Sequence, residues 1–204
     1  MAAMSDIRNI CVYCGSSPGT DRDFVAAASH FGKILAENRI GLVYGGGSTG
    51  LMGALAHAVH AHGGDVVGVI PEFLRARERM FKLAREVVVT QDMHERKRIM
   101  FERADAFVAL PGGIGTLEEL VEQLTWAQLG RHKKPILIVN LKAYWDGLIE
   151  LFDHMNRLGF IHAAGLLSYH VCDRVEEILP TLRRAVAAVS KEEQAGDAEV
   201  VERL

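Results

Sequence analysis

Short apolar runs alternate with longer amphipathic stretches along almost the whole chain. The apolar runs show no polar alternation, which is typical of strands buried on both faces of a parallel sheet. They predict strands over residues 10–14, 41–44, 66–70, 86–89, 106–110, 136–139 and 168–172. The stretches between them have helical periodicity and predict helices over residues 23–37, 49–62, 93–103, 117–129, 144–158 and 175–188. This order predicts an α/β fold, a doubly wound parallel sheet of about seven strands with helices on both faces.

Length and composition limit this fold to one domain. The chain has 204 residues, 49% of them hydrophobic, which is enough for one well-buried α/β domain over residues 1–189. Residues 190–204 are mostly polar, and we expect them to form a flexible C-terminal tail. No apolar stretch approaches the roughly 18 residues that cross a membrane, and the N-terminus lacks the pattern of a signal peptide.

Charge and cysteine content narrow the partners and the location. The formal net charge is −3, so no overall basic field favours nucleic acid as a partner. Three cysteines in this context are typical of a reduced, cytoplasmic protein. Cys11 and Cys14 lie three apart on a predicted strand, where their side chains point to opposite faces, so the two thiols are not expected to meet. We predict no metal site and no cofactor.

Glycine-rich turns follow three of the predicted strands. In a doubly wound sheet, ligands bind beyond the carboxyl ends of the strands, so the turns at 15–17, 45–47 and 111–113 are expected to converge on one crevice. Residues 45–50 also satisfy the G-x-G-x-x-G pattern of nucleotide-binding turns, although they follow the second strand rather than the first. Gly46 and Gly47 are therefore candidate substrate-binding residues. The alternative is that these glycines only allow a close turn and tight helix packing.

The most informative segment is Pro111–Glu119, which joins a predicted strand to a predicted helix. A strand that ends in Pro-Gly-Gly and continues as a helix presents free backbone N–H groups, where phosphate binds well. Thr116 is predicted to cap this helix, which would make Glu119 part of a capping box and favour its ionised form. Phosphate-binding groups beside Glu118 and Glu119 suggest chemistry on a phosphorylated sugar or nucleotide.

The preceding helix carries cations at positions that its periodicity places inward. Met93, Arg96, Lys97 and Met100 follow the spacing i, i+3, i+4 and i+7 in a helix that Asp92 can cap. A buried cation needs a partner, so Arg96 is expected to pair with a site carboxylate or a ligand phosphate. The alternative is that both cationic side chains reach solvent along the helix surface.

The helix predicted over residues 117–129 has an apolar face and a polar face. The buried stripe of that helix is expected to be Leu117, Leu120, Val121 and Leu124. Glu118, Glu122 and Thr125 would then share a different face.

The basic run over residues 75–85 is interpreted as a solvated surface, with a mobile basic flap over an anionic substrate as the alternative.

In combination, these motifs make the chain resemble the LOG (Lonely Guy) family of cytokinin riboside 5′-monophosphate phosphoribohydrolases. The matching segments occur in the family's order and are 14–17, 43–53, 93–97, 111–119 and 125–130. An Arg-Lys pair together with PGGxGTxxE is highly specific for this family. The resemblance implies a Rossmann-like nucleotide-binding fold, usually a homodimer. It also implies hydrolysis of the N-glycosidic bond of an adenosine 5′-monophosphate, N6-modified in cytokinin precursors, to free base and ribose 5-phosphate.

The resemblance also implies roles for individual residues. Arg96 and Glu119 would be the catalytic pair, and Glu78 would be the family's upstream substrate-binding glutamate, which favours the flap. The other implied substrate-binding residues are Lys97, Gly113, Ile114, Gly115, Thr116, Leu117, Glu118 and Thr125. Many family members carry Tyr where this chain has Ile114, so a backbone role there is retained and a contact through a ring is lost.

These residues predict a mechanism. The 5′-phosphate docks on the N–H groups of residues 113–116, and ionised Glu119 stabilises the oxocarbenium-like ribose or aligns the attacking water. Arg96 stays protonated and is expected to hold Glu119 or the ligand in place. The alternatives are a general AMP or purine nucleotide nucleosidase and a non-catalytic nucleotide carrier. Relatives have also been labelled lysine decarboxylases, but the sequence offers no context for a pyridoxal Schiff-base lysine.

Overall fold

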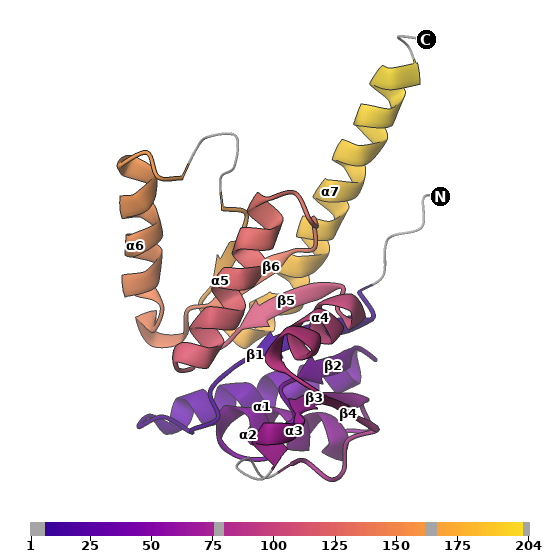
Figure 1. The fold of residues 1–204 in the computed structure, drawn as a ribbon, viewed down its shortest axis with the longest axis vertical. Helices are drawn as coiled ribbons and strands as arrows, with labels where there is room; N and C mark the ends of the chain where they lie inside the picture. Colours follow the sequence, from indigo (N-terminus) through magenta and orange to yellow (C-terminus); the bar gives the residue numbers. More distant parts are fainter. Residues whose placement is uncertain (1–6, 76–79, 162–166, 202–204) are drawn as a thin grey trace.

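The sheet of the computed structural model contains seven strands, all paired in parallel (Figure 1). The structure describes residues 7–75, 80–161 and 167–201, with side chains described as far as residue 189. The strands are β1 (Asn9–Tyr13), β2 (Gly41–Tyr44), β3 (Val66–Pro71), β4 (Glu86–Thr90), β5 (Ala106–Ala109), β6 (Ile136–Val139) and β7 (His170–Cys172). Their spatial order is β4-β3-β2-β1-β5-β6-β7, so the direction of winding reverses between β1 and β5. The predicted doubly wound α/β fold is confirmed.

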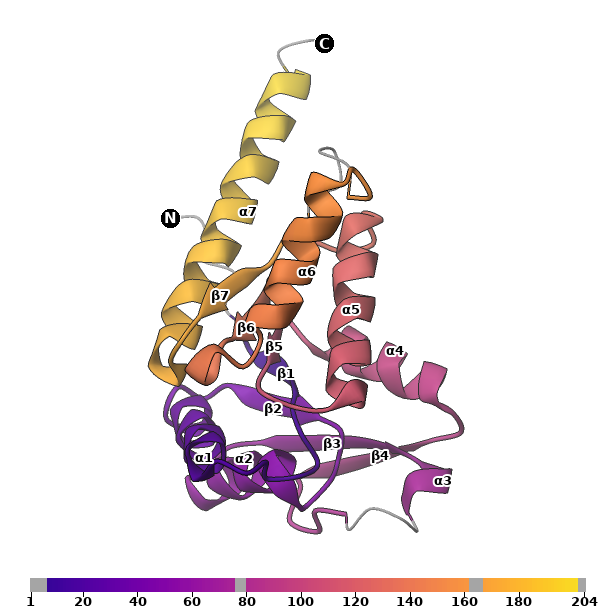
Figure 2. The ribbon, with the colours of Figure 1, turned by 90° about the vertical axis from the view of Figure 1, so that its left-hand side faces the viewer.

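Helices cover both faces of this sheet. They are α1 (Arg22–Glu37), α2 (Gly50–Ala61), α3 (Glu72–Arg75), α4 (Met93–Arg103), α5 (Ile114–Gln128), α6 (Asp146–Arg157) and α7 (Ile178–Val201), with short 3-10 turns η1 (Leu141–Ala143) and η3 (Val175–Glu177). Figure 2 shows α1, α2 and α7 on one side of the sheet and α4, α5 and α6 on the other. The last helix was expected to end at residue 188, but the backbone of α7 stays helical to Val201 and includes most of the predicted tail.

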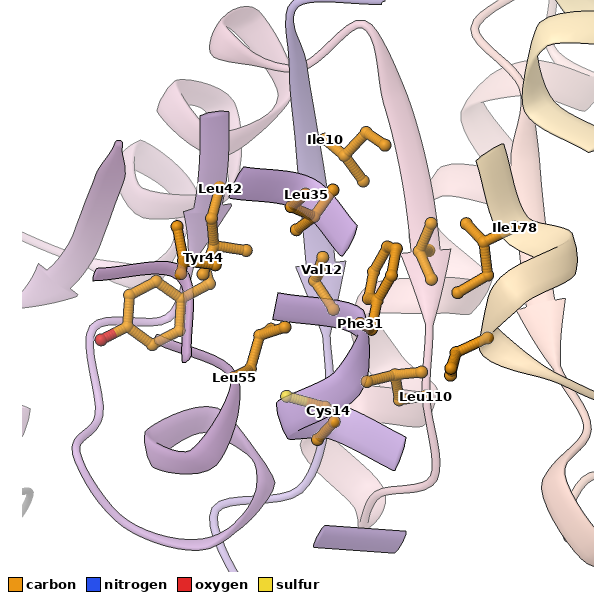
Figure 3. Close-up of a cluster of buried hydrophobic side chains, with 14 of the residues drawn as sticks. Ile10, Val12, Cys14, Phe31, Leu35, Leu42, Tyr44, Leu55, Leu110 and Ile178 are labelled. Atoms are coloured by element: carbon orange, nitrogen blue, oxygen red, sulfur yellow. The ribbon is translucent and has the colours of Figure 1, made fainter. Parts of the chain in front are cut away.

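The two faces of the sheet bury separate hydrophobic layers. Ile10, Val12 and Cys14 point toward α1, α2 and α7, as Figure 3 shows. Cys11 and Tyr13 point into the layer under α4, α5 and α6. Alternate residues of a strand face opposite sides, so the prediction that Cys11 and Cys14 cannot meet is confirmed. Both thiols are free and buried. Among the described residues, no helix is long and apolar enough to cross a membrane.

The turns after β1 and β5 interlock at the carboxyl edge of the sheet, where the winding reverses. The Gly15 N–H donates to the Pro111 carbonyl at 3.0 Å, and the Gly15 carbonyl accepts from the Leu51 N–H of α2, also at 3.0 Å. A Cβ on Gly112 would lie 2.8 Å from the Gly15 nitrogen, so these two segments of the backbone pass too closely for a side chain at position 112. This close contact fixes the Pro-Gly-Gly turn that leads into α5.

Candidate active site

Arg96 of α4 and Glu119 of α5 form an ion pair below the carboxyl edge of the sheet. Arg96 is 9% exposed and Glu119 is 8% exposed. The Arg96 Nη2 lies 3.1 Å from the Glu119 Oε1, and the Arg96 Nε donates to the Val69 carbonyl at 3.1 Å. Asp92 caps α4 by accepting from the Glu95 N–H at 2.8 Å, as predicted. The predictions that Arg96 points inward and pairs with a carboxylate are therefore confirmed.

Lys97 forms a second charged cluster beside this pair. Its Nζ lies 2.6 Å from the Glu118 Oε1 and 2.8 Å from the Glu122 Oε1. Burial lowers the pKa of Lys97, but the bonds to the two carboxylates outweigh that effect and raise its pKa above the ordinary value. Two adjacent cations of α4 therefore face three carboxylates of α5.

The protonation of Glu119 differs from the sequence prediction. Burial raises the pKa of Glu119 from 4.5 to about 7. Arg96 favours the ionised form and opposes this shift, while the neighbouring carboxylates of Glu118 and Glu122 add to it. Burial and the neighbouring carboxylates therefore outweigh the preference for the ionised form that the sequence predicts from the helix N-terminus.

The predicted capping box is also wrong. Helix α5 begins at Ile114, and its N-cap is Gly113, whose backbone is extended at φ −87° and ψ −159°. Thr116 is inside the first turn with its side chain buried, and Glu119 is in the second turn, where its carboxylate pairs with Arg96. The helix starts three residues earlier than a Thr116 cap requires because the glycine turn already provides the extended cap residue.

The buried face of α5 is more polar than predicted. Its buried residues are Thr116, Glu119, Leu120, Gln123 and Leu124. Val121, expected in the stripe, is 38% exposed. Gln123 is completely buried, and its side-chain amide bonds to no residue that the structure describes. The burial of Gln123 is not predictable from the sequence, because a single amide in a polar-rich helix carries no signal of burial.

The N-terminus of α5 is open. The first intrahelical donor is the Leu117 N–H, which bonds to the Gly113 carbonyl at 3.1 Å, so the N–H groups of residues 114–116 precede the helical ladder. A Cβ added at Gly113 or Gly115 would meet nothing within 4 Å, and neither has a positive φ. The fold itself therefore does not require glycine at these two positions. Ile114 between them is 81% exposed.

A cavity of about 260 Å³ lies beside this helix terminus. Its lining includes the turn after β1 (Gly15–Gly19), the turn after β5 (Pro111–Gly113), Phe24, Leu51 and Tyr144. The Tyr144 hydroxyl donates to the Gly112 carbonyl at 2.6 Å. Two of the three glycine turns therefore converge on one cavity, as predicted, but the turn at 45–47 does not line it.

The turn at 45–47 is filled by the protein's own atoms. A Cβ on Gly45 would lie 2.5 Å from the Arg96 Nη2. Gly46 has a φ of +83°, and its carbonyl accepts from the Phe81 N–H at 3.1 Å. Gly47 forms an isolated bridge with Met80. Close packing therefore accounts for glycine at position 45, and the positive φ accounts for it at position 46.

One of the implied binding residues, Thr125, lies away from this arrangement. Thr125 is exposed on α5, where its hydroxyl donates to the Val121 carbonyl at 2.8 Å. It lies nine residues beyond Thr116, roughly 13 Å along the helix axis. Glu78 lies outside the described residues. Within the described part of the chain, no group of three or more His, Cys, Asp or Glu side chains is placed to hold a metal ion.

The fold and the site define an α/β protein with an open helix N-terminus near a buried Arg–Glu pair. A family model described as "Possible lysine decarboxylase" matches residues 52–182. The probable cytokinin riboside 5′-monophosphate phosphoribohydrolase LOG4 of Oryza sativa subsp. japonica is 46% identical over 96% of this chain and 85% of its own length. LOG7 of Arabidopsis thaliana, with the same named activity, is 50% identical over 77% of this chain and 72% of its own. The chain belongs to this LOG family.

A solved structure agrees on the fold. The Moco carrier protein from Chlamydomonas reinhardtii superposes with a TM-score of 0.66 and 22% sequence identity. The match covers 90% of this chain and 99% of the carrier. At this identity the likeness establishes the shared fold alone.

Proposed function

We propose that this protein hydrolyses the N-glycosidic bond of an N6-modified adenosine 5′-monophosphate, releasing the free base and ribose 5-phosphate. The observation that carries the proposal is the position of Glu119, three residues beyond Thr116 on α5 and buried against Arg96. A phosphate on the N–H groups of residues 113–116 would sit roughly 5 Å along the helix axis from this carboxylate. That spacing suits a sugar phosphate whose ribose lies beside Glu119.

The two glycines at the helix start support the phosphate part of this proposal. Gly113 and Gly115 have neither crowded surroundings nor a positive φ. Glycine at such positions lets a ligand approach the backbone closely. The relatives are named for the same reaction class, which supports the substrate.

Glu119 would act on the ribose in its ionised form. As the glycosidic bond breaks, positive charge develops on the ribose, and a carboxylate held in a buried site stabilises that charge or takes a proton from the attacking water. The pKa of about 7 suits a group that exchanges a proton near neutral pH. Arg96 remains protonated and holds the carboxylate in place through the 3.1 Å contact.

Replacement of Glu119 tests the proposal. Incubation with AMP and with isopentenyl-adenosine monophosphate, followed by chromatography, should show free base for the wild type. Glu119→Ala and Glu119→Gln should both lower kcat by about 10²–10⁴, the range for loss of an acid–base group. Glu150→Gln, on the exposed side of α6, is the matched control and should keep the wild-type rate. A Glu119→Ala protein that released base at the wild-type rate would contradict the mechanism.

The same assay separates the remaining candidates. Nucleotide that stays bound and intact would identify a carrier instead of an enzyme. Among enzymes, the ratio of kcat/KM for isopentenyl-adenosine monophosphate and AMP distinguishes the proposed activity from a general purine nucleotide nucleosidase. We expect the modified nucleotide to have the higher value because the relatives named in the comparison are cytokinin riboside 5′-monophosphate enzymes.

Lysine decarboxylation fits these residues poorly. A pyridoxal phosphate cofactor forms its Schiff base with a lysine whose amine is neutral. Lys97, the lysine beside the Arg96–Glu119 pair, lies between Glu118 and Glu122, and its raised pKa keeps it protonated. We therefore propose no decarboxylase step and assign Lys97 to the charged cluster of the nucleotide site.

We also propose that the protein is a cytoplasmic homodimer, as the family resemblance implies. Exposed apolar side chains on α5, α6 and the turn after α6 support a partner surface, and they are Val121, Leu129, Leu151, Leu158 and Phe160. The three free cysteines fit a reducing compartment. Light scattering should give twice the chain mass of 22.4 kDa, and a monomer mass would contradict the dimer.

A further inference from the structure

We propose that Tyr144 is a positioning residue for the 5′-phosphate of the substrate. In this proposal, the Tyr144 hydroxyl fixes the peptide unit between Gly112 and Gly113, and so aims the Gly113 N–H at the phosphate. The inference rests on the proposed function, because it names a further residue of the same nucleotide site.

The Tyr144 hydroxyl acts on a single peptide unit, the one between Gly112 and Gly113. The Tyr144 Oη donates to the Gly112 carbonyl oxygen at 2.6 Å. A peptide unit is planar and trans, so its C=O and N–H groups point in opposite directions. A bond that fixes the Gly112 carbonyl therefore also fixes the Gly113 N–H. Close packing holds Gly112 against Gly15 and Thr116, whereas Gly113 has open surroundings, so the bond from Tyr144 restrains this peptide unit on its Gly113 side.

The segment that carries the Tyr144 ring is held by its own hydrogen bonds. The Asn140 side chain accepts from the Trp145 N–H and donates to the Asp146 carboxylate, both at 2.7 Å. Lys142 and Ala143 have φ values of +53° and +60°, a left-handed conformation that L-residues rarely adopt. Such a conformation persists only where surrounding contacts impose it, and it often marks a ligand site.

Three contacts to the start of α1 complete this restraint. The Lys142 Nζ lies 2.6 Å from the Asp21 carboxylate and also pairs with Asp23, at the N-terminus of α1. The Tyr144 ring meets Phe24 edge-to-face, with centroids 5.7 Å apart. The segment from Asn140 to Asp146 is thus fastened across the turn after β1, which holds the hydroxyl in place over Gly112.

Tyr144 lies at the cavity beside the start of α5. Tyr144 lines the 260 Å³ cavity together with Ser16, Ser17 and Gly113. Hydroxyl groups and a backbone N–H are donors that suit the oxygens of a phosphate ester. Tyr144 therefore lines the cavity together with the turn that leads into α5, and its bond to Gly112 sets the direction of one of the donors that the phosphate would meet.

Binding of the two halves of the substrate tests this assignment. Tyr144→Phe removes only the hydroxyl and keeps the ring contacts. By calorimetry, we expect the Kd of ribose 5-phosphate to rise roughly tenfold, the effect of one hydrogen bond to a charged group. The Kd of adenine should not change. KM for AMP should rise by the same factor while kcat stays within about twofold.

Two further variants make the outcome specific. Tyr169→Phe removes a tyrosine hydroxyl outside the cavity that Tyr144 lines, and it should leave the Kd values of ribose 5-phosphate and adenine and the KM for AMP unchanged. Lys142→Met loosens the strained segment and should raise the Kd of ribose 5-phosphate about two- to threefold, in the same direction as Tyr144→Phe. An unchanged Kd for ribose 5-phosphate in Tyr144→Phe would overturn the assignment. An equal weakening for ribose 5-phosphate and adenine would also overturn it, because it would indicate a general structural defect.

These outcomes are distinguishable from a failure of the proposed function. A wild-type protein that releases no base, but binds ribose 5-phosphate in a Tyr144-dependent way, would refute the activity and retain the positioning role. A protein that releases base with affinities independent of Tyr144 would do the reverse.

Discussion

Two glycine-rich turns lie at the same edge of the sheet, yet their surroundings are opposite. The turn at 45–47 is buried, and an added Cβ would lie 2.5 Å from the Arg96 Nη2 at Gly45 and 3.3 Å from the Ile70 Cβ at Gly46, while Gly47 is bridged to Met80. In the turn that leads into α5, Gly113 and Gly115 are exposed, and an added Cβ would meet nothing within 4 Å. The same residue type therefore serves the fold in one turn and leaves room for a ligand in the other.

The comparison shows that a glycine pattern indicates close approach without saying what approaches. In the first turn, the approaching group is the Arg96 side chain, which lies against Gly45 and pairs with Glu119 from that position. In the second turn, the proposed approaching group is a phosphate. Arg96 and Glu119 thus connect the two turns, and substitutions at each turn should have different consequences.

The largest effect is expected for Gly45→Ala. The new Cβ would lie 2.5 Å from the Arg96 Nη2, so the guanidinium must move away from Glu119 or from the Val69 carbonyl. We expect kcat to fall by about 100-fold or more, because small displacements of a catalytic group have effects of that size. The melting temperature should fall by roughly 5 °C or more as the buried pair is disturbed.

The control for Gly45→Ala is Gly147→Ala in α6, where, in contrast to Gly45, an added Cβ would meet nothing within 4 Å. It should leave kcat unchanged and raise the melting temperature slightly, since alanine favours a helix over glycine by up to about 1 kcal/mol. A folded Gly45→Ala protein with wild-type kcat would show that the first turn does not position Arg96.

A smaller effect of a different kind is expected for Gly115→Ala. The position is helical and uncrowded, so the melting temperature should stay the same or rise by about 1–3 °C. The methyl group would enter the space assigned to the phosphate, and KM for AMP should rise roughly tenfold with little change in kcat. Steady-state kinetics and thermal melting on the same preparation test both halves. An unaltered KM would remove the main reason for assigning this turn to the ligand.

The sequence predicted the two members of the central pair because each leaves a periodic or a motif signal. Arg96 lies at an inward helical position, and an inward cation requires a carboxylate partner. Glu119 follows a glycine turn that marks a helix start. The seven strands were found to within two residues at each end because buried parallel strands are continuous apolar runs.

Other features could not be predicted because they depend on contacts between distant residues or on backbone detail. The Tyr144–Gly112 bond joins positions 32 residues apart. The start of α5 was misplaced because Thr116 and Glu119 have the spacing of a capping box, while the extended backbone of Gly113 already caps the helix. The pKa of Glu119 depends on burial, and a sequence does not state how deep a side chain lies.

The smallest expected effect concerns the pH dependence of the pair that connects the two turns. If ionised Glu119 is the active form, kcat/KM should fall as the pH drops below about 7, because the carboxyl group then binds a proton. Glu122→Gln removes a negative neighbour that raises this pKa, so the acid limb should move to lower pH by less than one unit. Lys97→Met removes a positive neighbour and should move the limb to higher pH.

The nucleotide's own phosphate also titrates near pH 6, but it does so identically with every variant, so the difference between variants reports on the enzyme. Limbs that coincide in all three proteins would mean that Glu119 does not set the acid limb, and the link between the two turns would then be structural.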